Sequence, residues 1–180
     1  VLTLKYIYKE NKLKTNMEKE GMFWSKIGNK VRCELCPHFC VLGKGEVGKC
    51  HARENINNKL VSLSYSRLCS LAIDPIEKKP LYHFLPGAKT LSIASPGCNL
   101  KCKHCQNWGI SQTKVRTIEM SPEQVIKEAK KDKIKIISYT YSEPVVFYEY
   151  MLDIAKLARK NKVKNVLVTN GYFSKESFDY

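Results

Sequence analysis

The sequence lacks any apolar run that approaches the roughly 20 residues needed to cross a bilayer. Its first residues, Val1 to Asn16, also lack the apolar core and small-residue cleavage site of a secretory signal. There are no internal repeats and no low-complexity blocks. Hydrophobic residues still make up 43% of the chain, which is enough to bury a core. We therefore expect a folded, cytosolic protein that does not associate with membranes.

Acidic residues are scarce: 17 Asp and Glu stand against 31 Lys and Arg, for a net charge of +14. Such a charge could serve contact with nucleic acid or attract an anionic partner. The lysines are scattered, as at Lys130, Lys131 and Lys160, and form no basic stripe interleaved with aromatics. We interpret the charge as a Lys-rich surface in water and do not expect nucleic acid as the partner.

Both ends of the sequence suggest a fragment. It opens with Val1 rather than Met, residues 1–16 have no clear period, and Met17 is a plausible start. At the other end, Ser174 to Tyr180 stops just as a new helix is expected to begin. We predict that residues 1–16 are an extension outside the folded domains.

The remaining sequence alternates strand and helix patterns. A helix is predicted to begin at Ser121, where Ser, Pro and Gln124 form a capping box, and another at Pro144. Residues 74–87 hold three prolines and predict an ordered connector. Strands are predicted at 59–65, 90–94, 133–140 and 163–169.

The last three strands alternate with the two helices, which implies βαβ units and a parallel sheet. Ligands of such sheets bind at the carboxyl ends of the strands. Three polar segments follow these strands: the cysteines after 90–94, residues 141–144, and residues 169–171. We expect them to share one rim.

Eight cysteines occur, seven of them in two groups. Cytosolic reductants keep thiols reduced, so clustering points to metal or iron–sulfur ligation rather than to disulfides. The second group is Cys98-x3-Cys102-x2-Cys105, which places three thiolates on one loop. Zinc sites usually use CxxC pairs or histidines, and a ferredoxin would need a fourth cysteine close by. We interpret the triplet as ligands of a [4Fe–4S] cluster with one open iron; zinc or plain core cysteines are the alternatives.

The stretch Ser95–Asn107 (SPGCNLKCKHCQN) resembles the signature of radical SAM enzymes, which use S-adenosylmethionine (SAM). It is similar to the activating enzymes of glycyl radical enzymes, such as that of pyruvate formate-lyase. Over roughly residues 17–180 the pattern is closest to the radical SAM enzyme of the AmmeMemoRadiSam system. The segments that carry this likeness are CELCPHFC (33–40), GEVGKCHAREN (45–55), DPIEKKPLYHFLPG (74–87), GCNLKCKHCQNWGISQ (97–112), YTYSEP (139–144) and VTNGY (168–172).

The resemblance implies that the open iron binds SAM and that one electron from the cluster cleaves it. The products would be methionine and a 5′-deoxyadenosyl radical that abstracts hydrogen from a substrate, which can be a protein. A flavodoxin-like or ferredoxin-like reductant would supply the electron. No catalytic residue is assigned beyond the cluster ligands.

The resemblance also implies cofactor-binding residues. Ser142-Glu143-Pro144 stands where activases carry a Gly-Gly-Glu turn, so Glu143, with Ser142, would accept a hydrogen bond from the amino group of SAM. Alternatively, Glu143 simply begins a helix. Thr169 and Asn170 could approach the carboxylate or ribose of SAM, or could form only a turn. His104 replaces an aromatic residue that usually stacks near the adenine, and the alternative is a solvated loop residue.

The first cysteine group has the number of thiols of a tetrahedral site, for which zinc fits best and a second iron–sulfur cluster is the alternative. A small module with little core needs such a staple. His38 or His51 could replace one thiol. Its members are Cys33, Cys36, Cys40 and Cys50.

The predicted architecture is α/β: a metal-stapled, Cys-rich module and connector at 17–88, then the first half of a radical SAM (βα) barrel of TIM type at 89–180. About three βα units fit this length, so the barrel would be truncated. We predict a radical SAM enzyme. The alternatives are an iron–sulfur electron-transfer protein without SAM chemistry and a zinc-stapled, basic nucleic-acid-binding module.

Overall fold

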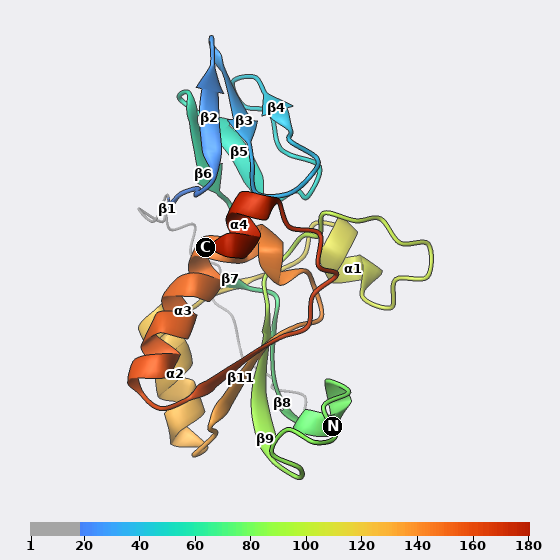
Figure 1. The fold of residues 1–180 in the computed structure, drawn as a ribbon, viewed down its shortest axis with the longest axis vertical. Coiled ribbons are helices and arrows are strands. Elements are labelled where there is room, and N and C mark those ends of the chain that lie inside the picture. The colour runs from blue at the N-terminus through green and yellow to red at the C-terminus, as the bar shows by residue number, and fades with distance from the viewer. Residues whose placement is uncertain (1–18) are drawn as a thin grey trace.

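The computed structural model describes residues 19–180, and the predicted extension at 1–16 lies outside the described residues. Figure 1 shows a β-rich part at one end of the molecule and a sheet flanked by helices at the other. We call residues 19–62 the N-terminal module. Within residues 19–180, no helix is both long and apolar enough to cross a membrane.

The N-terminal module consists of two small antiparallel sheets, with strand orders β1-β6-β5 and β2-β3-β4. Asn57 and Asn58, both with positive φ, make the two-residue turn between β5 and β6, a conformation that Asn tolerates better than most residues. The predicted strand at 59–65 is found, but it ends at Ser62. The strands are β1 (Lys19–Glu20), β2 (Trp24–Ile27), β3 (Lys30–Cys33), β4 (Val41–Leu42), β5 (Arg53–Ile56) and β6 (Lys59–Ser62).

A four-stranded sheet with the order β12-β11-β9-β8 forms the second part. Strands β9 (Lys89–Ala94), β11 (Ile136–Tyr139) and β12 (Lys164–Leu167) are parallel, as predicted, and match the last three predicted strands. Within residues 19–180 the strands do not close into a barrel, because β8 and β12 are the two edges of this sheet.

The edge strand β8 (Ser70–Pro75), which was not predicted, runs antiparallel to β9. The connection, residues 76–88, holds only the 3-10 turn η1 (Ile76–Lys78), whereas a parallel neighbour usually needs an α-helix to carry the chain back across the sheet. Asp74 and Pro75, expected in the connector, complete this strand. Pro75 is tolerated because the strand lies at an edge.

Helices α2 (Pro122–Lys131) and α3 (Tyr148–Lys160) lie side by side on one face of the sheet (Figure 1). The predicted capping box is present: the Ser121 side chain accepts from the Gln124 amide, and the Gln124 side chain accepts from the Ser121 amide. The second predicted helix begins with a 3-10 turn, η2 (Pro144–Phe147), before α3.

One continuous hydrophobic core joins the two parts of the molecule, because Val31 and Leu60 of the module belong to the same buried cluster as Ile93 and Ile154. Three short elements complete the fold: β7 (Arg67–Leu68), which pairs with β10 (Ile118–Glu119), and α1 (Trp108–Gln112). Helix α4 (Lys175–Asp179) lies against the module, where the Ser177 hydroxyl donates to the carbonyl of Leu35 at 2.8 Å.

Candidate functional site

The three cysteines of the predicted cluster site lie on the loop of residues 95–107, here called the cysteine loop, which follows the carboxyl end of β9. Cys98 and Cys105 are half-buried and Cys102 is exposed. Burial raises the pKa of the Cys98 thiol, helped by the nearby charges of Glu143, Cys105 and Cys102 and opposed by a hydrogen bond from the Leu100 amide at 3.4 Å. The three thiols therefore lie on one accessible loop, although no three His, Cys, Asp or Glu side chains within residues 19–180, these included, are close enough together to hold a metal ion.

Gly97, directly before Cys98, is required by the geometry of this loop. Its φ of +108° lies in a region that side chains rarely adopt, and an added Cβ would lie 2.5 Å from the carbonyl oxygen of Cys50. The cysteine loop therefore passes against the backbone of the N-terminal module.

Glu143 lies at the end of the next parallel strand and is only 3% exposed. Its Oε1 accepts from the hydroxyl of Thr169 at 2.6 Å and from the amide of Val145 at 3.0 Å, and its Oε2 accepts from the amide of Asn170 at 2.8 Å. Burial raises the pKa of this carboxyl, although these hydrogen bonds oppose the shift. The carboxylate caps η2 and also joins the ends of β11 and β12.

The predicted cofactor residues Ser142, Thr169 and Asn170 share this rim. The Ser142 hydroxyl donates to the carbonyl of Ser95 at the base of the cysteine loop. The side-chain amide of Asn170 donates to Oδ1 of Asn99 at 2.9 Å and lies 3.9 Å from the sulfur of Cys98. The structure therefore brings the three expected segments of the rim together.

His104 is not joined to this group. It is exposed on the cysteine loop and, within residues 19–180, makes no hydrogen bond to Glu143, Thr169 or Asn170. Asn99 occupies a central position instead: it is 4% exposed, and its side-chain amide donates to the carbonyl of Tyr172 at 3.0 Å. Sequence reasoning missed Asn99, because its contacts reach segments distant in the chain.

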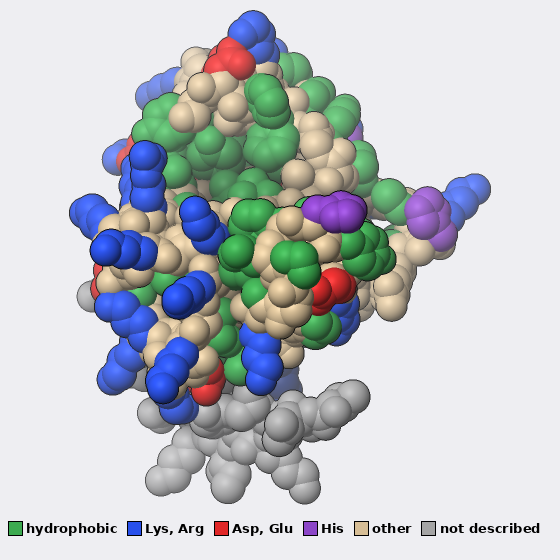
Figure 2. All heavy atoms as spheres, turned by 60° about the horizontal axis from the view of Figure 1, so that its bottom comes forward, with side chains coloured by type: hydrophobic (Ala, Val, Ile, Leu, Met, Phe, Trp, Pro, Cys, Tyr) green, Lys and Arg blue, Asp and Glu red, His purple; other side chains and the backbone are tan. Residues whose placement is uncertain are grey.

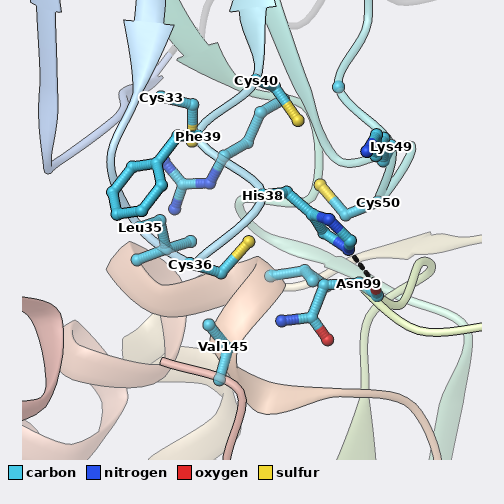
Figure 3. A pocket seen from close by; sticks show the side chains of 13 residues that line it. Cys33, Leu35, Cys36, His38, Phe39, Cys40, Lys49, Cys50, Asn99 and Val145 are labelled. Atoms are coloured by element: carbon cyan, nitrogen blue, oxygen red, sulfur yellow. Dashed lines mark hydrogen bonds between the residues drawn. The ribbon is translucent and has the colours of Figure 1, made fainter. Parts of the chain in front are cut away.

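The four cysteines of the N-terminal module line one cavity of about 20 Å³ (Figure 3). Cys33 ends β3, Cys36 and Cys40 lie in the turn to β4, and Cys50 precedes β5. Burial raises the pKa of Cys33 and Cys36, and that of Cys50 to about 12. A Cβ added at Gly48 would lie 3.9 Å from the sulfur of Cys40 and 3.9 Å from that of Cys50.

The four sulfurs face this cavity without closing a coordination shell. Among residues 19–180, no three His, Cys, Asp or Glu side chains are close enough together to hold a metal ion. The donor chemistry nevertheless fits a thiophilic ion, and the volume suits a single ion rather than a cubane. The Nε of Arg53, in the cavity wall, is buried without a partner, so a thiolate sulfur could accept from it.

Arg53 also forms a buried ion pair that sequence reasoning missed. Its Nη2 lies 2.8 Å from both carboxylate oxygens of Glu149 on α3, and both side chains are 1% exposed. Burial disfavours the charged Arg53, but the carboxylate of Glu149 outweighs it and raises the pKa of the guanidinium. The pair joins the wall of the four-cysteine cavity to the helix that follows Glu143.

Comparison with known proteins finds a family match for the second part of the chain. Residues 92–180 match the domain model of the Radical SAM superfamily, and this segment contains the cysteine loop, Glu143 and Asn170. Such a domain implies a [4Fe–4S] cluster and SAM-dependent radical chemistry, and members of the superfamily are generally enzymes.

A relative is similar to this protein over more of the chain. MJ0808 of Methanocaldococcus jannaschii, described as an uncharacterized protein, is 51% identical over 162 residues, which are 88% of this chain. The aligned part is 49% of the relative, so the chain spans about half the length of the curated protein it matches.

Proposed function

We propose that Cys98, Cys102 and Cys105 hold the [4Fe–4S] cluster of a radical SAM enzyme. The observation that carries the proposal is their position after β9, at the same rim as Glu143 and Asn170. When bound, the cluster and SAM supply reductive cleavage of SAM to a 5′-deoxyadenosyl radical. Three cysteines leave a coordination position free for SAM.

The residues of the chain perform positioning in this proposal. Glu143 fixes the backbone of Asn170 through its Oε2, and the Asn170 side chain reaches Asn99 and Cys98. Ser142 ties the base of the cysteine loop to the end of β11. SAM would bind along this rim, with polar groups of Ser142, Glu143, Thr169, Asn170 and His104 as its candidate contacts.

Anaerobic reconstitution of the full-length protein tests this proposal. We expect four irons and four sulfides at the cysteine loop, a reduced-cluster EPR signal that SAM changes, and 5′-deoxyadenosine as product. Cys102→Ala should abolish all three, whereas Cys69→Ala, a cysteine outside both groups, should not. A signal that SAM leaves unchanged would instead indicate an iron–sulfur electron-transfer protein, and salt-sensitive binding of RNA or DNA after iron removal would indicate a nucleic-acid-binding module.

We propose that the substrate is a protein partner, by analogy with the activating enzymes of glycyl radical enzymes. This proposal rests on the resemblance of residues 95–107 and of the wider motifs. A uniformly deuterated protein fraction should transfer deuterium into 5′-deoxyadenosine, whereas a deuterated small-molecule fraction should not. The reverse result would exclude a protein substrate.

The four thiols of the N-terminal module are proposed to bind one structural zinc ion. Support comes from the size of the cavity, its four sulfurs and the unpartnered Nε of Arg53. One zinc per chain is expected, with loss of zinc in Cys36→Ala and its retention in Cys69→Ala. Iron in this site after anaerobic purification would favour a second iron–sulfur cluster instead.

The larger architecture also belongs to the proposal. Strands β9, β11 and β12 would be the first three strands of a (βα) barrel at 89–180, after a metal-stapled module at 17–88. The superfamily match of residues 92–180 and the parallel order of the strands support this division. A cytoplasmic location and a flavodoxin-like or ferredoxin-like donor stay predictions.

A further inference from the structure

The two cysteine groups, far apart in the sequence, lie against each other in the structure. Asn99, which follows Cys98, lines the four-cysteine cavity together with Cys36 and His38 (Figure 3). Three separate contacts make this junction.

The first contact is between backbones. Gly97 packs so closely on the carbonyl of Cys50 that no side chain fits there, and its added Cβ would also lie 3.3 Å from the Cβ of Ala52. The position of the Cys50 backbone therefore limits the path of the chain into Cys98.

The second contact is the hydrogen bond between His38 Nε2 and the carbonyl oxygen of Asn99, at 2.7 Å. A carbonyl can only accept, so His38 donates through a protonated Nε2. The ring of His38 also packs edge-on against Tyr172, with 5.2 Å between the ring centroids. His38 lies in the turn between Cys36 and Cys40, so two proposed zinc ligands bracket it.

The third contact is the side chain of Asn99. It lines the four-cysteine cavity together with Cys36 (Figure 3). The same side chain donates to the carbonyl of Tyr172 and accepts from the side-chain amide of Asn170. Asn99 thus links the four-cysteine cavity to the rim that carries Cys98 and Asn170.

From these contacts we infer that the N-terminal metal site positions the cysteine loop, with His38 as the positioning residue between them. This inference rests on the proposed function, because it assumes zinc at the four thiols and a cluster at the loop. Bound zinc would fix the turn of residues 36–40 and the backbone of Cys50, which otherwise have only short strands to hold them. The fixed turn then holds Asn99 through His38 and holds Gly97 through Cys50.

The test compares His38→Ala, His38→Gln and the exposed control His83→Ala in the reconstituted full-length protein. His38→Ala should keep its zinc but lose cluster iron to a chelator about five-fold faster, the factor expected for one hydrogen bond. His38→Gln, which retains a donor, should lose iron at a rate close to that of the wild type. His83→Ala should lose iron at the wild-type rate. Cys36→Ala, which lacks zinc, should lose iron faster still, and the EPR signal with SAM should broaden in both fast variants.

Equal rates of iron loss in wild type, His38→Ala and Cys36→Ala would overturn the inference while leaving radical SAM chemistry intact. Loss of zinc from His38→Ala would also overturn it, because His38 would then be a ligand rather than a positioning residue. A wild-type protein that assembles no cluster at the cysteine loop would overturn the proposed function and this inference together.

Discussion

At the scale of single residues, the buried carboxylates of Glu143 and Asp74 serve different ends of the same sheet. Glu143 is surrounded by neutral donors at the carboxyl end of β11, and burial raises the pKa of its carboxyl. Asp74, on the edge strand β8, accepts from the ammonium groups of Lys78 and Lys79, each at 2.8 Å, and from the hydroxyl of Tyr141. The first organises the rim, and the second stabilises the fold.

Replacement of Glu143 by Gln should loosen the turn at Thr169 and Asn170. The amide can offer one oxygen where the carboxylate offers two, so an NH₂ group faces either the Asn170 amide or the Thr169 hydroxyl. We expect a loss of about 1–3 kcal/mol in the free energy of unfolding and faster hydrogen exchange at the Asn170 amide. The exposed control Glu119→Gln should change neither the free energy of unfolding nor the hydrogen exchange at the Asn170 amide. Unchanged exchange at Asn170 in Glu143→Gln would show that Glu143 does not hold this turn.

The effect of Asp74 should depend on pH. Burial works against ionisation, but hydrogen bonds from Lys78, Lys79 and Tyr141 outweigh it and hold the pKa of Asp74 well below its usual range. Because the folded pKa is depressed, this stabilisation is present above the unfolded value of about 3.9 and is lost as pH falls through the folded value.

Asp74→Asn should therefore lower the free energy of unfolding by about 3 kcal/mol at pH 7, where it leaves the buried Lys79 without its counterion. The difference from wild type should shrink progressively below about pH 4. Urea unfolding over a pH series measures this, with the exposed Asp132→Asn as control. A difference that stays constant down to pH 2 would contradict the assignment.

At the scale of elements, Gly97 in the cysteine loop and Gly109 in α1 allow the same substitution to be compared at a crowded and at an open position. Gly97→Ala would place a Cβ 2.5 Å from the Cys50 carbonyl at a φ of +108°, whereas an alanine at Gly109 in α1 meets nothing within 4 Å. We expect Gly97→Ala to destabilise the protein by about 1–3 kcal/mol or more and to lower iron incorporation. Gly109→Ala should be neutral or slightly stabilising. Similar melting temperatures for the two variants would show that the close approach is not required.

The ion pair of Arg53 and Glu149 should couple strand β5 to helix α3. Removal of one partner, as in Arg53→Met or Glu149→Gln, leaves an uncompensated buried group, so each should lower the free energy of unfolding by about 3–5 kcal/mol. The double variant should lose much less free energy of unfolding than the sum of the losses in the two single variants. The exposed pair of Lys59 and Glu20, at 2.9 Å, should contribute about 1 kcal/mol or less. Additive losses for Arg53 and Glu149 would show that the pair is not coupled.

These elements also show what the sequence could predict. The capping box at Ser121 and the parallel strands were predictable because their signals are local: a cap residue and an apolar run. The antiparallel edge strand β8 was missed because it depends on pairing with β9, and its last residues, Asp74 and Pro75, were assigned to the connector. The spacing of Cys98, Cys102 and Cys105 is likewise local. The bonds of Asn99 and the pair of Arg53 and Glu149, 96 residues apart, leave no pattern in the sequence.

At the scale of the whole molecule, the excess of positive charge is distributed rather than concentrated. On the face in Figure 2, Lys and Arg side chains stand as separate groups over the helical side of the molecule, with few acidic neighbours. The net charge of +14 nevertheless creates a field that reaches beyond single side chains. Such a field speeds the approach of a negatively charged partner and slows that of a cation.

The reduction of the cluster should therefore depend on salt in a way that reports the charge of the donor. With a reduced, acidic flavodoxin, the second-order rate should fall about ten-fold between 20 and 300 mM salt, because screening removes the attraction. With the methyl viologen radical cation, the same increase in salt should raise the rate or leave it unchanged. Stopped-flow absorbance of the full-length, reconstituted protein measures both rates under identical conditions. If salt lowered the reduction rate equally for both donors, salt would be acting on the cluster itself rather than on the approach of the donor. The positive surface charge would then not favour an acidic donor over a cationic one.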